Sequence, residues 1–250
     1  MTDAQTPLLA VVVPVKNEAD NVLPLIGEIF AALDGRLPFE IVYVDDGSDD
    51  ATPARLREAR ARYPMLRVVR HKKSCGQSQA VATGVKAAVA PLIATLDGDG
   101  QNDPADIPAM VERLLAEPEA ARSLLLVAGH RQKRQDDGLR LISSRIANKL
   151  RAGLLQDDTP DSGCGLKVLS REAFLDMPRF NHMHRFLPAL MIRRGGRVVS
   201  VRVNHRPRER GVSKYGVWNR LWVGIVDLFG VMWLQARASV PEIEPSGERP

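Results

Sequence analysis

Two aspartates separated by one glycine are the residues of this 250-residue sequence that most clearly suggest chemistry. Asp97 and Asp99 follow an apolar run and precede Pro104, and Gln101 stands two positions after the second aspartate. Carboxylate and amide oxygens at this spacing can bind one hard cation such as Mg²⁺ or Mn²⁺, which normally completes its shell with water and substrate phosphates. The segment therefore predicts a divalent metal site at Asp97, Asp99 and Gln101. A polar turn with capping aspartates is the alternative.

Phosphate groups near such a metal must be bound without a glycine-rich cradle. Neither G-x-x-x-x-G-K-[ST] nor G-x-G-x-x-G follows the first apolar run, which excludes a P-loop and a Rossmann dinucleotide fingerprint. Metal and cationic side chains then have to balance the phosphate charge, and arginine is suited to bidentate phosphate contact. The second half of the chain supplies the candidates, which are Arg131, Lys133, Arg134, Arg140, Arg145, Arg206, Arg208, Arg210 and Lys214.

The net charge of +5 conceals an asymmetry between the halves. Residues 1–125 carry 13 basic and 18 acidic side chains, whereas residues 126–250 carry 22 basic and 12 acidic ones. The basic half is expected to meet an anion, which could be phosphate groups, nucleic acid or a membrane surface. Aromatic residues make up only 5% of the chain, and all three tryptophans stand near its end, so no base-stacking platform is expected. A nucleic-acid partner is therefore not expected.

The elements that must position these residues alternate between apolar runs and amphipathic stretches. Without polar alternation, the runs are typical of a sheet covered on both faces, and the repeated strand–helix order predicts parallel neighbours. The fold class is thus α/β with a doubly wound, mostly parallel sheet, in which ligands bind beyond the carboxyl ends of the strands. Segments 14–18, 45–50 and 97–103 should meet there. We expect strands at 8–13, 39–44, 66–69, 92–96, 124–128, 166–169 and 198–203, and helices at 18–33, 51–62, 77–89, 104–116, 138–153, 183–193 and 217–235.

Seven short motifs occur in an order that resembles a known family. They are PVKNE, VDDGSDDAT, LDGDGQNDP, GHR, ISSRIAN, DSGCGLK and RERGVSKYG. Together, over about residues 10–216, they resemble an inverting family 2 glycosyltransferase of the GT-A fold, in the dolichol-phosphate mannose synthase branch. The specificity of this resemblance lies in the set of motifs rather than in any single one. This branch often has an aromatic residue where the sequence has Lys16.

The resemblance implies a role for each matching residue. It implies a nucleotide-sugar donor, either GDP-mannose or a UDP-sugar, with the divalent ion on its diphosphate. It implies an acceptor phosphate bound by Arg131, Arg140 and Ser144. Asp99, Arg131, Arg140 and Lys214 are the catalytic residues it implies. The implied donor-binding residues are Pro14, Lys16, Glu18, Asp45, Asp46, Asp97, Gly98, Arg208 and Lys214.

The chemistry of the residues agrees with a lipid phosphate as acceptor. A sugar hydroxyl needs a general base, whereas a polyprenyl phosphate is already ionised at neutral pH and can attack directly. We therefore expect transfer of a hexosyl group to an undecaprenyl or dolichyl phosphate, with inversion. The alternative is a soluble or glycan hydroxyl acceptor, with Asp161 as base. His71, His130, His182 and His184 have no obvious partner in the sequence and are expected to be structural.

The segment at 217–238 predicts how the protein meets a membrane. Its large apolar residues recur at helical spacing on one face, which carries all three tryptophans, and Asp227 interrupts the run. This pattern favours an interfacial amphipathic helix over a membrane span, and with no signal peptide it predicts a cytoplasmic protein on the inner face of the membrane. The alternative is packing on the sheet, on a second copy in a homodimer, or on a membrane-protein partner.

The sequence predicts one GT-A domain over residues 1–238. Residues 8–130 form its nucleotide-sugar half, 131–216 its acceptor half and 217–238 the interfacial helix. The tail at 239–250 is rich in proline and glutamate and is expected to be disordered. Two cysteines are too few for a disulfide scaffold and suit a reducing compartment.

Overall fold

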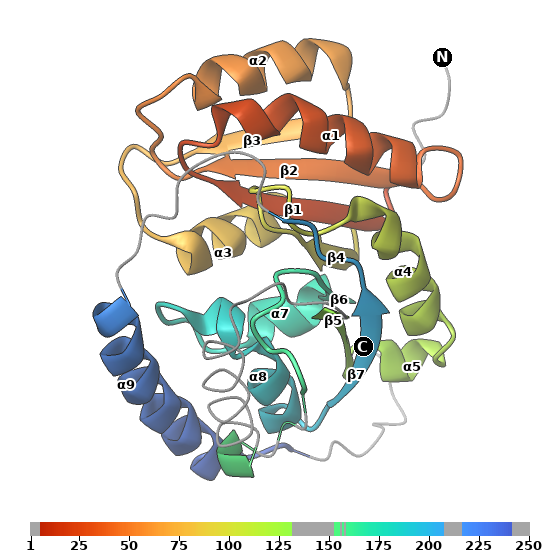
Figure 1. Ribbon diagram of the computed structural model, residues 1–250. Coiled ribbons are helices and arrows are strands. Elements are labelled where there is room, and N and C mark those ends of the chain that lie inside the picture. The colour runs from red at the N-terminus through yellow and green to blue at the C-terminus, as the bar shows by residue number, and fades with distance from the viewer. Residues whose placement is uncertain (1–5, 132–152, 156, 158, 208–216, 242–250) are drawn as a thin grey trace, which may run out of the picture.

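The computed structural model describes residues 6–131, 153–155, 157, 159–207 and 217–241, and for 217–223 the backbone alone (Figure 1). The helix expected at 138–153 and the tail at 242–250 lie essentially outside these residues. The described residues form one seven-stranded sheet with helices on both faces, in the order β3-β2-β1-β4-β6-β5-β7. The strands are β1 Leu9–Val15, β2 Phe39–Asp45, β3 Leu66–Arg70, β4 Leu92–Thr95, β5 Leu125–Arg131, β6 Lys167–Ser170 and β7 Arg197–Val203.

Strand direction decides which residues reach the functional edge of the sheet. β1 pairs in parallel with β2 and with β4, β2 with β3, and β5 with β7. β6 runs antiparallel to both of its neighbours, β4 and β5. The carboxyl ends of the other six strands therefore share one edge, and β6 brings its amino end to it. The expected mostly parallel α/β sheet is confirmed.

The helices divide into two layers, each of which buries one side of the sheet. Side chains in β1 alternate: Leu9, Val11 and Val13 belong to one buried cluster, and Ala10 and Val12 belong to the other. The first cluster is covered by α1 Ala19–Leu33, α2 Thr52–Arg62 and α4 Ile107–Leu115, and the second by α3 Gln77–Ala87, α7 Arg171–Asp176 and α8 Leu187–Arg193. A fully buried aliphatic side chain contributes about 1.5–3 kcal/mol, so both layers stabilise the sheet.

Helix starts follow the expected local chemistry in part. Asp103 accepts a hydrogen bond from the backbone N–H of Ala105 (3.0 Å) and precedes Pro104 at the start of the 3-10 turn η1 Pro104–Asp106, after which α4 begins. The short helix α5 Glu119–Arg122 leads into β5. The single helix expected at 183–193 is wrong: the chain forms the 3-10 turn η2 Met183–Arg185 and then α8, with Pro188 in the first turn of α8. A proline fits this start because the first helical N–H groups have no partner within the helix.

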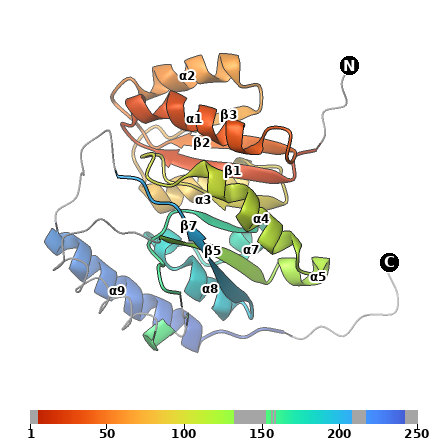
Figure 2. The same ribbon diagram turned by 45° about the vertical axis from the view of Figure 1, so that its right-hand side comes forward.

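Helix α9, Val217–Ala236, lies against α8 at the periphery of the molecule (Figure 2). Val231 is fully buried, and Leu228, Met232 and Leu234 pack on the same cluster. Asp227 pairs with His182 at 2.9 Å between Oδ2 and Nδ1. Phe229 and Trp233, by contrast, are 64% and 61% exposed. Within the described residues, none of the helices has the length and apolar character needed to cross a bilayer.

Candidate active site

The Asp97–Gln101 segment turns sharply at the carboxyl end of β4. Gly98 lies so close to β1 that an added Cβ would stand 2.9 Å from the Pro14 carbonyl oxygen, and Gly100 adopts a positive φ of 74°. The tight approach and the left-handed turn both favour glycine. Asp99 Oδ1 accepts a hydrogen bond from the backbone N–H of Gln101 (3.1 Å). The loop thus presents Asp97, Asp99 and Gln101 from one short turn.

The surroundings of Asp97 disfavour its negative charge and would favour a bound cation. Burial and the neighbouring charge of Asp99 raise the pKa of Asp97 to about 6, against the opposing influence of Lys167 and Arg131. Oδ1 of Asp97 also accepts a hydrogen bond from Gln77 Nε2 at 2.7 Å. Two like charges at a buried position are unfavourable until a cation joins them. The carboxylate pair therefore fits the divalent ion expected from the sequence.

The loop that enters β6 forms the wall opposite Asp97. A Cβ added at Gly165 would stand 2.2 Å from Oδ2 and 2.4 Å from Cγ of Asp97, so this position leaves no room for a side chain. Thr95 Oγ1 donates a hydrogen bond to the Gly165 carbonyl oxygen (2.7 Å) and fixes the loop next to β4. Gly165 therefore permits the Asp97 carboxylate to occupy its place.

Arg131, the last residue of β5, enters the same site. Its Nε and Nη2 atoms donate to the two carboxylate oxygens of Asp161 at 2.6 and 2.7 Å. Such a two-bond contact fixes the plane of the guanidinium group. Arg131 thus engages both oxygens of Asp161. An aspartate held in this way is poorly suited to act as the general base considered above.

These groups line one cavity of about 300 Å³. Its lining includes Asp97, Arg131 and the buried Lys167, whose pKa is lowered by burial. Lys167 Nζ donates to the Cys164 carbonyl oxygen. The lining residues are Pro14, Gln77, Val81, Thr95, Leu96, Asp97, Gln101, Arg131, Ser162, Gly163, Cys164, Gly165, Lys167, His184, Arg185 and Leu187.

A second hollow of about 290 Å³ lies beside the turn at Asp99 and Gly100, against α1. Arg206, which follows β7, forms part of its wall and pairs with Glu28 and with Asp103, each at 2.7 Å. The backbone N–H of Arg206 also donates to the Gln101 carbonyl oxygen (2.9 Å). The segment after β7 is thereby fastened to the loop that follows β4.

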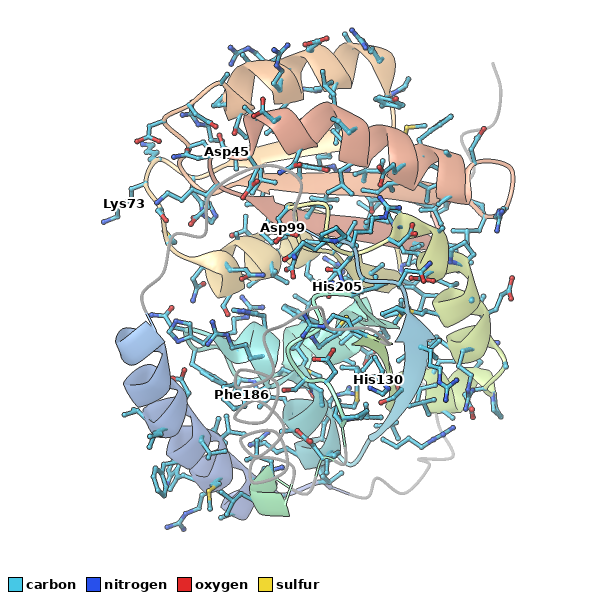
Figure 3. The ribbon with its side chains drawn as sticks, in the orientation of Figure 1. Asp45, Lys73, Asp99, His130, Phe186 and His205 are labelled. Atoms are coloured by element: carbon cyan, nitrogen blue, oxygen red, sulfur yellow. The ribbon has the colours of Figure 1, made fainter. Side chains whose placement is uncertain are left out.

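Asp45, the last residue of β2, and Asp46, which follows it, have different surroundings. Asp45 is 1% exposed, accepts from the backbone N–H of Ser48 (2.9 Å) and pairs with Arg70 at 3.0 Å. In Figure 3, Asp45 and Asp99 lie at the end of the sheet to which β1 and β2 point. The structure therefore brings Asp45 to the same edge as the metal pair.

Asp46 instead anchors the loop before α3. Its carboxylate accepts from Ser74 Oγ (2.7 Å) and from the backbone N–H groups of Cys75 (2.8 Å) and Gly76 (2.9 Å). Burial favours a higher pKa for Asp46, but the hydrogen bonds outweigh it and hold the pKa below its ordinary value. His71 bonds to Asp46 through Nδ1 and to Thr83 through Nε2. The ligand atoms of Asp46, His71 and Cys75 lie within 4.8 Å of one another, yet the carboxylate and both ring nitrogens already have protein partners.

The first loop of the site is tied to the second. The backbone N–H of Glu18 donates to Thr52 Oγ1 (2.9 Å), and Glu18 Oε2 accepts from Asn21 Nδ2 (2.7 Å). Pro14 reaches the cavity, whereas Lys16 is exposed outside it. Of the remaining sequence-predicted site residues, Arg140, Ser144, Arg208 and Lys214 lie outside the described residues.

Four residues of the site were not expected from the sequence. Gln77 bonds to Asp97, Lys167 is buried in the cavity wall, and Ser78 bonds to His184 over a separation of 106 residues. His71, His182 and His184 have protein partners that the sequence did not reveal. Lys167 ends the DSGCGLK motif, which was the available signal. For Ser78 and His184 the sequence contains none, because their contact depends on the tertiary fold.

Comparison with known proteins identifies the family. Residues 10–177 match Glycosyl transferase family 2. The chain belongs to this family. It is 38% identical over 238 residues to a dodecaprenyl-phosphate galacturonate synthase of Rhizobium johnstonii, which covers 93% of this chain and 69% of the relative. It is 36% identical over 225 residues to an undecaprenyl-phosphate 4-deoxy-4-formamido-L-arabinose transferase of Edwardsiella ictaluri, covering 87% of this chain and 66% of the relative. The chain thus spans about two thirds of the length of these relatives. The glycosyltransferase class expected from the sequence is confirmed.

The fold is that of GT-A enzymes. The glucosyl-3-phosphoglycerate synthase from Mycobacterium tuberculosis, in complex with UDP, superposes with a TM-score of 0.68 at 19% identity, over 94% of this chain and 82% of that chain. A second structure of that enzyme, with a TM-score of 0.66 and the same identity and coverage, contains Mn²⁺, UDP-glucose and glycerol 3-phosphate. At this identity the likeness shows the fold.

Proposed function

We propose that this glycosyltransferase moves a hexosyl group, with inversion, from a nucleotide diphosphate sugar to a polyprenyl phosphate, with Mg²⁺ or Mn²⁺ as cofactor. The observation that carries the proposal is the joint placement of Asp97 and Arg131 on the lining of one cavity. A cation site for a leaving diphosphate and a cation for an incoming phosphate then face the same space. The named activities of the two relatives, both on polyprenyl phosphates, support this acceptor class.

The chemistry needs no proton acceptor at the attacking oxygen. An oxygen of the acceptor phosphate forms a bond to the anomeric carbon, and the bond from that carbon to the diphosphate breaks, so the nucleoside diphosphate leaves with the electron pair. Asp161 is held by Arg131, in keeping with a reaction that needs no carboxylate base. Catalysis then rests on orientation and charge. A divalent ion bound at Asp97, Asp99 and Gln101 would neutralise charge on the leaving group.

Other residues complete the proposal at positions matched to the family. We assign Pro14, Glu18 and Asp45 to the base and ribose of GDP-mannose or a UDP-sugar, Arg140 and Ser144 to the acceptor phosphate beside Arg131, and Arg208 and Lys214 to the donor phosphates. For Asp45, support comes from its burial at the edge where the donor loops meet. Asp46 supports the site indirectly, because its carboxylate holds the loop that leads to α3.

The outer face of α9 is proposed to rest on the inner surface of the membrane. Four large apolar side chains of this helix are exposed and recur at helical spacing, namely those of Ile225, Val226, Phe229 and Trp233. Val231 is buried against the protein. Such an exposed aromatic and aliphatic face suits the boundary between lipid head groups and acyl chains. In this placement the helix would keep the enzyme where a polyprenyl phosphate is presented.

A transfer assay with defined acceptors tests the proposal. Purified protein is incubated with undecaprenyl phosphate in detergent, Mn²⁺ and, in separate reactions, UDP-glucose, UDP-galacturonic acid or GDP-mannose. We expect sugar in the lipid fraction with at least one donor, and none after chelation of the metal. Asp99→Asn should reduce transfer at least about 100-fold without unfolding the protein, because a ligand of the ion is lost, whereas Glu112→Gln on the exposed side of α4 should not. Transfer to glycan hydroxyls but not to the lipid would overturn the acceptor assignment.

A further inference from the structure

His184 lines the candidate active-site cavity and has no role in the proposed metal site or acceptor-phosphate site. It lies in η2, between α7 and α8, and its partner Ser78 directly follows Gln77, which lines the same cavity. Ser78, in the first turn of α3, holds it at two atoms. Ser78 Oγ lies 2.7 Å from Nδ1 of the ring and accepts a hydrogen bond from the backbone N–H of His184 at 3.3 Å. Both the ring and its backbone are thus fixed.

The remaining ring nitrogen is available for a ligand. Nε2 of His184 has no hydrogen-bond partner within the described part of the chain. The Ser78 oxygen already accepts the backbone N–H, so its own proton can be donated to Nδ1, which leaves the ring hydrogen on Nε2. Burial, followed by the charge of Arg185, lowers the pKa of His184 to about 3. At neutral pH the ring is therefore uncharged, so it can donate a hydrogen bond through Nε2–H but does not act as a cationic acid.

The position of His184 in the cavity narrows the choice of ligand. Asp97 marks the side of the leaving diphosphate, and Arg131 marks the side of the acceptor phosphate. The transferred sugar has to lie between the two phosphate positions, because its anomeric carbon is bonded first to the diphosphate of the donor and then to the phosphate of the acceptor. A neutral donor suits a sugar hydroxyl, whereas the two phosphate positions already have cations. Gln77 donates a hydrogen bond to Asp97, and the next residue, Ser78, contacts His184, so the start of α3 links these two parts of the cavity.

We propose that His184 binds a hydroxyl group of the transferred sugar through Nε2, and that Ser78 is the positioning residue that fixes its ring. This inference rests on the proposed function, since it requires a nucleotide-sugar donor in this cavity. It adds a sugar-recognition residue to a site in which the other assigned groups bind phosphate, metal or nucleoside. It also explains why a histidine with a strongly lowered pKa stands beside a reaction that needs no base.

Donor binding without acceptor tests the assignment. Calorimetric titrations with Mn²⁺ compare UDP with UDP-glucose and UDP-galacturonic acid, and GDP with GDP-mannose. For each nucleotide sugar that binds the wild type, His184→Leu should weaken affinity about tenfold, in the range of one lost hydrogen bond, and leave the affinity for its nucleoside diphosphate unchanged. His184→Gln, whose amide can donate near the position of Nε2, should recover most of the loss. Ser78→Ala should shift affinity in the same direction by less.

The control and the contradicting outcomes are distinct. His182→Asn changes a histidine two positions away that pairs with Asp227 rather than lining the cavity, and asparagine accepts its positive φ of 66°, so donor affinity should stay at the wild-type value. Equal losses for nucleotide sugar and nucleoside diphosphate in His184→Leu, or no loss in either, would overturn the inference. A wild type that binds neither UDP nor GDP with Mn²⁺ would instead refute the proposed function.

Discussion

Asp97 is a carboxylate whose charge the fold disfavours. Its pKa of about 6 follows from burial and from the nearby charge of Asp99, and the hydrogen bond from Gln77 only partly offsets both. Because the folded-state pKa lies above its ordinary value of 3.8, the folded protein binds this proton more tightly than the unfolded chain. An ion that binds the carboxylate must displace the proton below about pH 6.

This leads to a prediction for pH. Without metal, the contribution of Asp97 to the free energy of unfolding should fall as pH rises from about 4 to about 6 and stay low above that range. The affinity for Mn²⁺ should show the opposite trend and weaken towards tenfold per pH unit below about pH 6. Calorimetric Mn²⁺ titrations between pH 5 and pH 8 measure the change in affinity. Metal-free unfolding of the wild type and of Asp97→Asn, which lacks this titration, measures the change in stability. A pH-independent affinity would contradict the assignment.

Gly165 gives a second prediction, at the wall facing Asp97. Gly165→Ala places a methyl group within 2.2–2.7 Å of three carboxyl atoms, so the Asp97 side chain has to move. We expect Mn²⁺ affinity to fall at least about tenfold, with a loss of stability of roughly 1–3 kcal/mol from overpacking. Gly163→Ala is the matched control in the same loop, because its Cβ would meet its nearest atom, Nη2 of Arg131, at 3.4 Å. Equal Mn²⁺ affinity in the two variants would show that Gly165 does not position the carboxylate.

Among the elements, the segment after β7 supports the metal loop from outside the cavity. Asn102 and His205 form an isolated antiparallel bridge, and Arg206 joins this loop to α1 through Asp103 and Glu28. The hydrogen bonds to these carboxylates raise the pKa of Arg206 against the effect of burial, so it stays charged at neutral pH. The loop after β4, which holds the proposed metal ligands, is thereby coupled to β7 at the edge of the sheet.

Removal of this link should loosen the loop. Arg206→Met keeps the length of the side chain but loses both ion pairs, which are partly exposed. We expect a loss of about 1 kcal/mol, or a fall in Tm of about 2–4 °C, together with weaker Mn²⁺ binding. Arg62→Met on α2, which loses only an exposed pair with Glu58, should change neither quantity measurably. Thermal unfolding with and without Mn²⁺ separates the two contributions, and an unchanged metal-induced shift in Tm would count against the link.

The two sides of α9 give a prediction about membrane contact. The double variant Phe229→Ser, Trp233→Ser alters only exposed side chains, so Tm should change little while association with vesicles of anionic phospholipid falls several-fold. Val231→Ser, on the buried side of the helix, should instead cost about 2 kcal/mol or more through loss of packing and burial of a hydroxyl. Co-sedimentation with vesicles and thermal unfolding are the two measurements. Vesicle association that the double variant leaves intact would refute the proposed role of this face.

At the scale of the whole molecule, the sequence predicts the sheet better than it predicts the full site. Apolar runs without alternation placed the strands to within a few residues, and the loops after β1, β2 and β4 meet at one edge because these strands are parallel. A search limited to the residues that follow each strand misses site residues at β6, because this strand runs antiparallel to its neighbours. There the residues before the strand, including Gly165, reach the site. Their proximity to Asp97 depends on long-range pairing that no local pattern encodes.

The pairing of β6 with both of its neighbours also limits how the enzyme can move. This strand is hydrogen-bonded to β4 on one side and to β5 on the other, so strands from the first and the second part of the chain share one continuous sheet. A hinge between the halves would break these backbone bonds, at a cost that substrate binding does not readily repay. We therefore expect the loops at the edge of the sheet to move when substrate enters and product leaves. Loop motions take nanoseconds to microseconds, which is faster than the collective rotation of separate domains. Turnover in such an enzyme should be limited by bond making or by product release rather than by domain opening.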